Sequence, residues 1–83
     1  MKGTIFQINP RRGMVAIETE NGDYSVFENI NGEEFDVGDK VYWKNDTGLG
    51  SELVENLTKG RTFDVYFENH WVSKSLLRVQ LHF

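Results

Sequence analysis

The glycines of this 83-residue chain recur at a spacing that is typical of short strands joined by turns. Most of them lie about ten residues apart, with alternating apolar and polar residues between them. They are Gly3, Gly13, Gly22, Gly32, Gly38, Gly48, Gly50 and Gly60. A chain of this length forms one small domain with a modest core. The pattern therefore predicts a small all-β domain.

The clearest single element is a β-hairpin over Met14–Glu28, with Asn21 and Gly22 at its tip. Asn-Gly is the preferred pair for a two-residue type I′ turn, because both positions need a positive φ. Pairing outward from this turn places Ala16 opposite Phe27. The face that we expect to point into the core consists of Val15, Ile17, Thr19, Tyr24 and Val26. The other face is mixed, and on it we expect Phe27 to be exposed.

Three further segments of the first sixty residues alternate as strands do. They are Lys2–Ile8, Lys40–Lys44 and Glu52–Thr58. Pro10 ends the first of them, because proline cannot donate a hydrogen bond to a strand ladder. Five short strands in so few residues close most economically into a barrel, which removes exposed strand edges.

The last part of the chain adds a sixth strand, Thr62–Glu68, and an ambiguous end segment, Val72–Phe83. The apolar residues of the end segment fit both a helical stripe and a strand alternation. Ser73 suits a helix N-cap, and Arg78 and His82 lie where a helix dipole favours cations. We therefore expect a short helix here, with a strand as the alternative.

Five short motifs follow one another in the first 59 residues. Lys2–Ile5 and Asn9–Gly13 resemble the opening of bacterial cold-shock domains, K-G-x-V and N-x-x-K-G-F-G-F-I. Asp23–Glu28, Gly38–Val41 and Val54–Thr58 resemble the later motifs D-V-F-V-H-F, G-x-x-V and A-x-N-V-T of that family. The resemblance implies a five-stranded OB barrel over residues 1–59. Residues 60–83 would be a C-terminal strand-plus-helix extension packed on this barrel in one structural domain.

Cold-shock domains bind single-stranded RNA or DNA by stacking bases on an aromatic face, with lysines along the phosphates. This chain departs from that pattern at most of the aromatic positions. The residues found at these positions are Gln7, Ile8, Met14, Ala16, Ser25 and Glu28. Phe27 occupies the position that is a histidine in the family motif. Because stacking contributes about 1–3 kcal/mol per base, the resemblance implies at most weak binding.

The residues that remain for a nucleic-acid site are Phe27, Phe6 and Met14, with the guanidiniums of Arg11 and Arg12. We expect Phe27 and Phe6 to stack on bases and Arg11, Arg12 and Lys2 to contact phosphates. The alternative is a protein-interaction module that has lost nucleic-acid binding. In that case the extension or a second subunit covers Phe27 and Met14.

The net charge of −4 excludes a strong, purely electrostatic nucleic-acid binder. The charge is unevenly distributed, with +3 over residues 1–17, −9 over 18–55 and +2 over 56–83. The chain has no cysteine, which excludes disulfides and fits a cytoplasmic location. No apolar stretch approaches the length of a membrane span, and the first residues alternate at once, so we expect no membrane segment and no signal peptide.

No motif for catalysis, metal binding or a cofactor stands out. His70 and His82 lack the spacing of a zinc site, so we expect them at the surface or at a helix end. The acidic residues before the fourth strand are expected in a solvated loop; they are Glu33, Glu34, Asp36 and Asp39. We therefore expect a binding protein and not an enzyme. Trp71 is expected to seal the barrel end, with an exposed anchor for a partner as the alternative.

Overall fold

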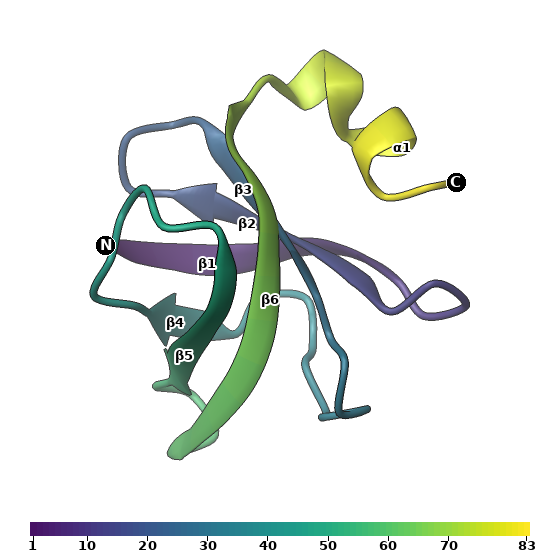
Figure 1. Ribbon diagram of the computed structural model, residues 1–83. Coiled ribbons are helices and arrows are strands. Elements are labelled where there is room, and N and C mark those ends of the chain that lie inside the picture. The colour runs from purple at the N-terminus through teal and green to yellow at the C-terminus, as the bar shows by residue number, and fades with distance from the viewer.

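Six antiparallel strands close into a barrel in the computed structural model, which describes residues 1–83 (Figure 1). The strands are β1 (Lys2–Asn9), β2 (Met14–Thr19), β3 (Tyr24–Glu28), β4 (Lys40–Tyr42), β5 (Gly50–Asn56) and β6 (Arg61–Val72). Their order is β1-β2-β3-β6-β5-β4, with β4 returning to β1. A 3₁₀ turn, η1 (Lys74–Leu76), and a four-residue helix, α1 (Leu77–Gln80), follow β6. The predicted all-β barrel and short C-terminal helix are confirmed.

The barrel has six strands and not the expected five, because β6 is part of it. β6 lies between β3 and β5, and it pairs with β5 at every residue from Gly50 to Asn56. Its pairing with β3 is interrupted by two register shifts. Such bulges bend a strand and increase its twist, which suits closure of a small barrel. Residues 61–72, expected in an extension packed on a five-stranded barrel, therefore belong to the barrel wall.

The β2–β3 hairpin pairs one residue away from the expected register. Ala16 lies opposite Val26 and not opposite Phe27. Gly22 has a φ of 87°, and its N–H donates to the carbonyl of Thr19, so the connection is a three-residue loop and not a type I′ turn. A shift of one residue reverses the faces of a strand. Phe27 therefore points into the barrel.

Two apolar cores result, one on each side of the sheet. The barrel interior holds Ile5, Val15, Ile17, Phe27, Phe35, Val41, Trp43, Val54, Phe63, Val65 and Phe67. The second core lies on the outer face and holds Met14, Ala16, Tyr24, Val26, Val72, Leu77 and Leu81. It forms because the segment after β6 folds back toward the outer face of the sheet (Figure 1). None of the helices has the length and apolar character that a membrane crossing requires.

Candidate functional site

The structure buries two of the residues that we expected to contact bases. Phe27 has no exposed surface, and its ring packs edge-on against Phe35 and Phe67, with centroids 5.2 and 5.7 Å away. Met14 is 4% exposed and belongs to the second core, together with Leu81. The expectation of an exposed Phe27 is wrong, because the register shift turns this side chain inward. Neither residue offers a free face to a base.

Phe6 lies on the outer face of β1, opposite in direction to the buried Ile5. Its ring packs edge-on against Tyr24 at 5.1 Å, and the ammonium of Lys74 lies 5.4 Å from the ring centroid. Burial, followed by the hydrogen bond that Tyr24 donates to Glu18, raises the pKa of Tyr24. The segment after β6 thus covers part of Phe6, and a base would have to displace Lys74 to stack there.

The two predicted arginines lie together in the β1–β2 turn. Arg11 and Arg12 are both exposed, and none of the ion pairs of the chain includes an arginine. The turn is held by a hydrogen bond from the Arg12 N–H to the Asn9 carbonyl and by Gly13, whose φ is 67°. Both guanidiniums are therefore free to bind an anion from outside the chain.

The end of the chain lies beside the same turn. The Asn9 side-chain amide donates a buried hydrogen bond of 2.8 Å to the Leu81 carbonyl. His82 then has a φ of 61°, a conformation that glycine usually provides after a helix. The N–H groups of His82 and Phe83 donate to the Val79 and Arg78 carbonyls at 3.1 and 3.0 Å, the pattern of a Schellman motif. This motif fixes the direction in which both residues leave α1.

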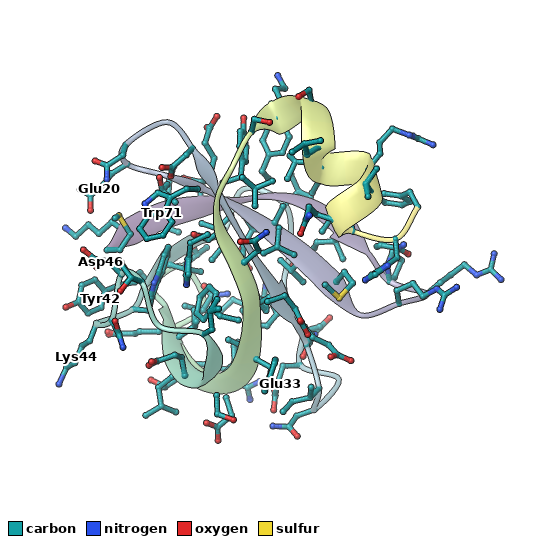
Figure 2. All side chains as sticks on the ribbon, turned by 45° about the horizontal axis from the view of Figure 1, so that its top comes forward. Glu20, Glu33, Tyr42, Lys44, Asp46 and Trp71 are labelled. Carbon is teal, nitrogen blue, oxygen red and sulfur yellow. The ribbon has the colours of Figure 1, made fainter.

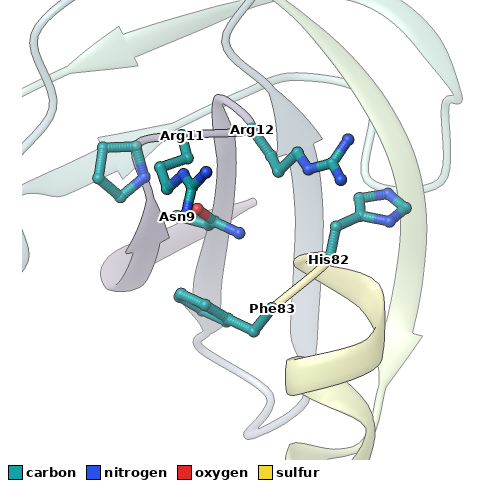
Figure 3. A pocket seen from close by; sticks show the side chains of 6 residues that line it. Asn9, Arg11, Arg12, His82 and Phe83 are labelled. Carbon is teal, nitrogen blue, oxygen red and sulfur yellow. The ribbon is translucent and has the colours of Figure 1, made fainter.

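The turn and the chain end border a hollow of about 590 Å³ (Figure 3). Its lining consists of Asn9, Pro10, Arg11, Arg12, His82 and Phe83. Phe83 is 53% exposed, and the guanidinium of Arg78 lies 5.9 Å from its ring centroid. No carboxylate side chain lines the hollow. An otherwise acidic chain thus gathers guanidiniums, an imidazole and an exposed ring in one place.

Acidic residues border the other hollows near β1. Glu33 and Glu34 line a separate hollow that shares Pro10, on the other side of the turn (Glu33 is labelled in Figure 2). Lys2, the third expected phosphate contact, lines a different hollow with Lys40 and two glutamates. The structure therefore does not bring Lys2 together with the arginines. Anion binding near Arg11 and Arg12 must depend on short-range contacts, because the nearby acids weaken the long-range attraction.

The sequence identifies Arg11 and Arg12 as candidate binding residues, but no pattern in it places His82 and Phe83 beside them. The contact that joins them, from Asn9 to Leu81, spans 72 residues. Asn9 ends a strand and Leu81 follows a helix, and no periodicity links two such positions. The one related feature of the sequence is the cationic end of the last segment, and the preference of a helix dipole for cations explains that feature equally well.

Two aromatic residues of β6 are placed differently from our expectation. His70 is buried; its Nδ1 lies 2.8 Å from the Ser25 hydroxyl, and its Nε2–H donates to the Gly48 carbonyl at 2.7 Å. A serine beside an imidazole suits nucleophilic catalysis, but Ser25 is 2% exposed, so this pair joins strands and meets no substrate. Trp71 is 67% exposed with a φ of 55°, and it projects from β6 without sealing the barrel (Figure 2).

The acidic segment before β4 is only partly solvated, because Asp39 is buried. Its Oδ2 accepts hydrogen bonds from the Asp36 N–H at 3.0 Å and from Asn56 and Lys59 at 2.9 Å each. Burial alone would raise the pKa of Asp39, but the three donors outweigh it and lower the pKa below its ordinary value. The hydrogen bonds to Asp36 and Asp39 raise the pKa of Lys59. This cluster ties the segment before β4 to the end of β5.

The structure contains no group of three or more histidine and acidic side chains that could hold a metal ion. Comparison with protein-family models, with curated proteins and with solved structures gives no match to the chain.

Proposed function

We propose that this chain is a divergent cold-shock-like OB barrel, a cytoplasmic binding module without catalytic activity that binds single-stranded RNA or DNA weakly. The observation that supports this most is the hollow lined by Arg11, Arg12, His82 and Phe83. A guanidinium offers a fork of N–H donors that matches a phosphate. An exposed aromatic ring stacks on a base of any kind. Proteins that bind single strands combine these two contacts.

The proposed site lies at the end of the barrel and not on the strand face that the family resemblance implies. On the outer face of β2 and β3, Leu77 and Leu81 pack against the sheet, and Phe27 points inward. Phe83 is the exposed ring beside the two arginines, and stacking contributes about 1–3 kcal/mol per base. Together with two phosphate contacts this supports a Kd in the high micromolar to millimolar range.

Titration of the isotopically labelled protein with short oligo-dT and oligo-U at low salt tests this proposal. The amide resonances of Arg11, Arg12, His82 and Phe83 should shift, and that of Phe27 should not. No shift at millimolar oligonucleotide would refute the proposal.

A matched pair of double variants separates this site from general charge. Replacement of Arg11 and Arg12 by glutamine should weaken binding about tenfold, because two phosphate contacts are lost. Replacement of Lys2 and Lys40 by glutamine removes the same charge from a different hollow and should change the Kd by less than about twofold. An equal loss in both double variants would show that no particular site exists.

The second candidate function, a protein-interaction module, is favoured by Trp71. A tryptophan with a positive φ carries backbone strain of order 1–3 kcal/mol. Because the Trp71 side chain is exposed, its packing within the monomer does little to offset this strain. Tryptophan is enriched in binding hot spots. A chain that shows no nucleic-acid binding, but whose Trp71 fluorescence changes on mixing with a protein partner, would fit this function instead.

A further inference from the structure

One edge of β5 has a stretch of backbone without a partner strand. β4 pairs with β5 through Val41 and Tyr42 only, although β5 begins at Gly50. After Tyr42 the chain stays beside the N-terminus, because the N–H of Trp43 donates to the Met1 carbonyl at 3.0 Å and the Met1 ammonium donates to the Trp43 carbonyl at 2.6 Å. Residues 43–49 then run past the N-terminus before the chain returns as β5 (Figure 1).

The alternation of a strand identifies the open groups. The Leu57 N–H donates to the Lys40 carbonyl at 2.8 Å, so the backbone groups of Leu57 face the β4 side. With a period of two, those of Glu55, Leu53 and Ser51 face the same side. Glu55 meets β4, but Leu53 and Ser51 have no opposite residue there, and neither takes part in a backbone hydrogen bond of the turns and loops. Two N–H and two C=O groups are therefore open along this edge.

A hollow of about 310 Å³ lies along the open edge. Its lining consists of Tyr42, Trp43, Lys44, Glu52, Leu53, Glu55 and Thr62. Leu53 is 59% exposed, so its side chain stands on the outer side of the hollow. Val54 and Trp43 are buried in the core, so an inward side chain of any occupant must be small. The volume is at the lower end of the range for ligand sites, about 300–1,000 Å³.

We propose that this edge binds an extended peptide, which adds to β5 as a short antiparallel strand. The open N–H and C=O groups of Leu53 and Ser51 would pair with the peptide backbone, as in other cases of strand addition. Outward peptide side chains lie opposite Leu53 and Ser51, because β4 already occupies the position opposite Glu55, and this favours an apolar residue opposite Leu53. Glu52 and Glu55 outnumber Lys44 in the lining, so the occupant carries positive charge.

A second copy of this chain fits this edge less well than a peptide does. Pairing two copies through Ser51 and Leu53 would place Glu52 opposite Glu52 of the other copy, and like charges facing each other destabilise a sheet. The edge is also recessed behind Tyr42–Lys44, and a second β5 would bring the same wall with it. A free peptide strand has neither obstacle.

The test uses the labelled full-length chain and the peptide Ac-Ser-Val-Ser-Lys-NH₂. Its valine would lie opposite Leu53, its lysine would lie opposite Ser51, and its serines would point inward. The amides of Ser51 and Leu53 should shift on titration. The same peptide N-methylated at valine keeps every side chain but loses one backbone donor, and it should bind at least about tenfold more weakly. Equal binding of both peptides, or no shift at millimolar peptide, would overturn the proposal.

Hydrogen exchange of the free protein tests the open edge without any variant or ligand. The N–H groups of Ser51 and Leu53 should exchange fast, whereas those of Glu52 and Val54, which face β6, should be protected. Protection of Leu53 equal to that of Val54 would show that the edge is already paired, and it would also overturn the proposal.

Discussion

Replacement of Asp39 by asparagine should destabilise the barrel strongly, although the sequence places this residue in an acidic loop. One carboxylate oxygen accepts three hydrogen bonds, from the Asp36 N–H, the Asn56 amide and the Lys59 ammonium. Asparagine keeps the shape and an acceptor oxygen but removes the negative charge. Because Asp39 is 5% exposed, water cannot replace what is lost.

The magnitude follows from these contacts. Hydrogen bonds to a charged group contribute about 1.5–3 kcal/mol each, and neutral ones about 0.5–1.5 kcal/mol. Three weakened bonds therefore cost about 3 kcal/mol, which corresponds to a fall in Tm of about 12–24 °C for a domain of this size. The pKa of Asp39 is lowered in the folded state. The stabilisation is thus complete above the unfolded-state pKa of about 3.9 and is lost as the pH falls through the lower folded-state pKa.

Urea unfolding, followed through the fluorescence of the buried Trp43, measures this effect. The matched control is Asp36→Asn, because Asp36 also pairs with Lys59 but is 70% exposed, and such surface pairs contribute about 0–1 kcal/mol. Asp39→Asn should lose about 3 kcal/mol at neutral pH, and its difference from the natural chain should shrink in acid. Equal losses in both variants, or a difference that does not depend on pH, would refute the reasoning.

Three further substitutions test the site and the register. His82→Gly removes the strain of a positive φ at a non-glycine residue and should stabilise the chain by about 1 kcal/mol, measured in a thermal melt. The same substitution should weaken oligonucleotide binding. A lower Tm would contradict the assignment of a Schellman motif. Phe27→Leu should cost about 1.5 kcal/mol in urea unfolding yet leave oligonucleotide affinity unchanged; lost affinity in a folded variant would restore Phe27 to the binding site. In Gly3→Ala the added Cβ would meet the Ile17 side chain and lie within 2.7 Å of the Glu18 carbonyl oxygen. The free energy of unfolding should therefore fall by about 2 kcal/mol. An unchanged unfolding midpoint would contradict the close approach of β1 and β2.

The sequence predicted the strands and the short helix well, because their signals are local. Glycine spacing and alternation placed all six strands approximately, and the acids, arginines and histidines were visible at once. The side to which Phe27 points could not be predicted in the same way. It depends on whether the loop at Gly22 has two or three residues, and Asn-Gly allows either. The length of this loop therefore decides whether the Phe27 side chain lies on an exposed face or in the barrel core.

The polar residues of the interior show the same limit for a different reason. A histidine or an aspartate is buried only where partners satisfy it. The partners of His70 are Ser25 and Gly48, from distant segments, and Asn56 and Lys59 lie 17 and 20 residues from Asp39. The hollow at Arg11 likewise exists only because the end of the chain folds back over the sheet. Contacts between distant segments therefore decided the candidate site, and the sequence supplied only its arginines.

The salt dependence of oligo-dT binding tests the proposed site most directly. Each phosphate neutralised on a single strand contributes a slope of about −0.7 to the plot of log K against log salt concentration. Two contacts, from Arg11 and Arg12, predict a slope of about −1.4 for the natural chain and close to zero for the double glutamine variant. A slope that is the same in both proteins would contradict the account, because the phosphates would then be bound elsewhere.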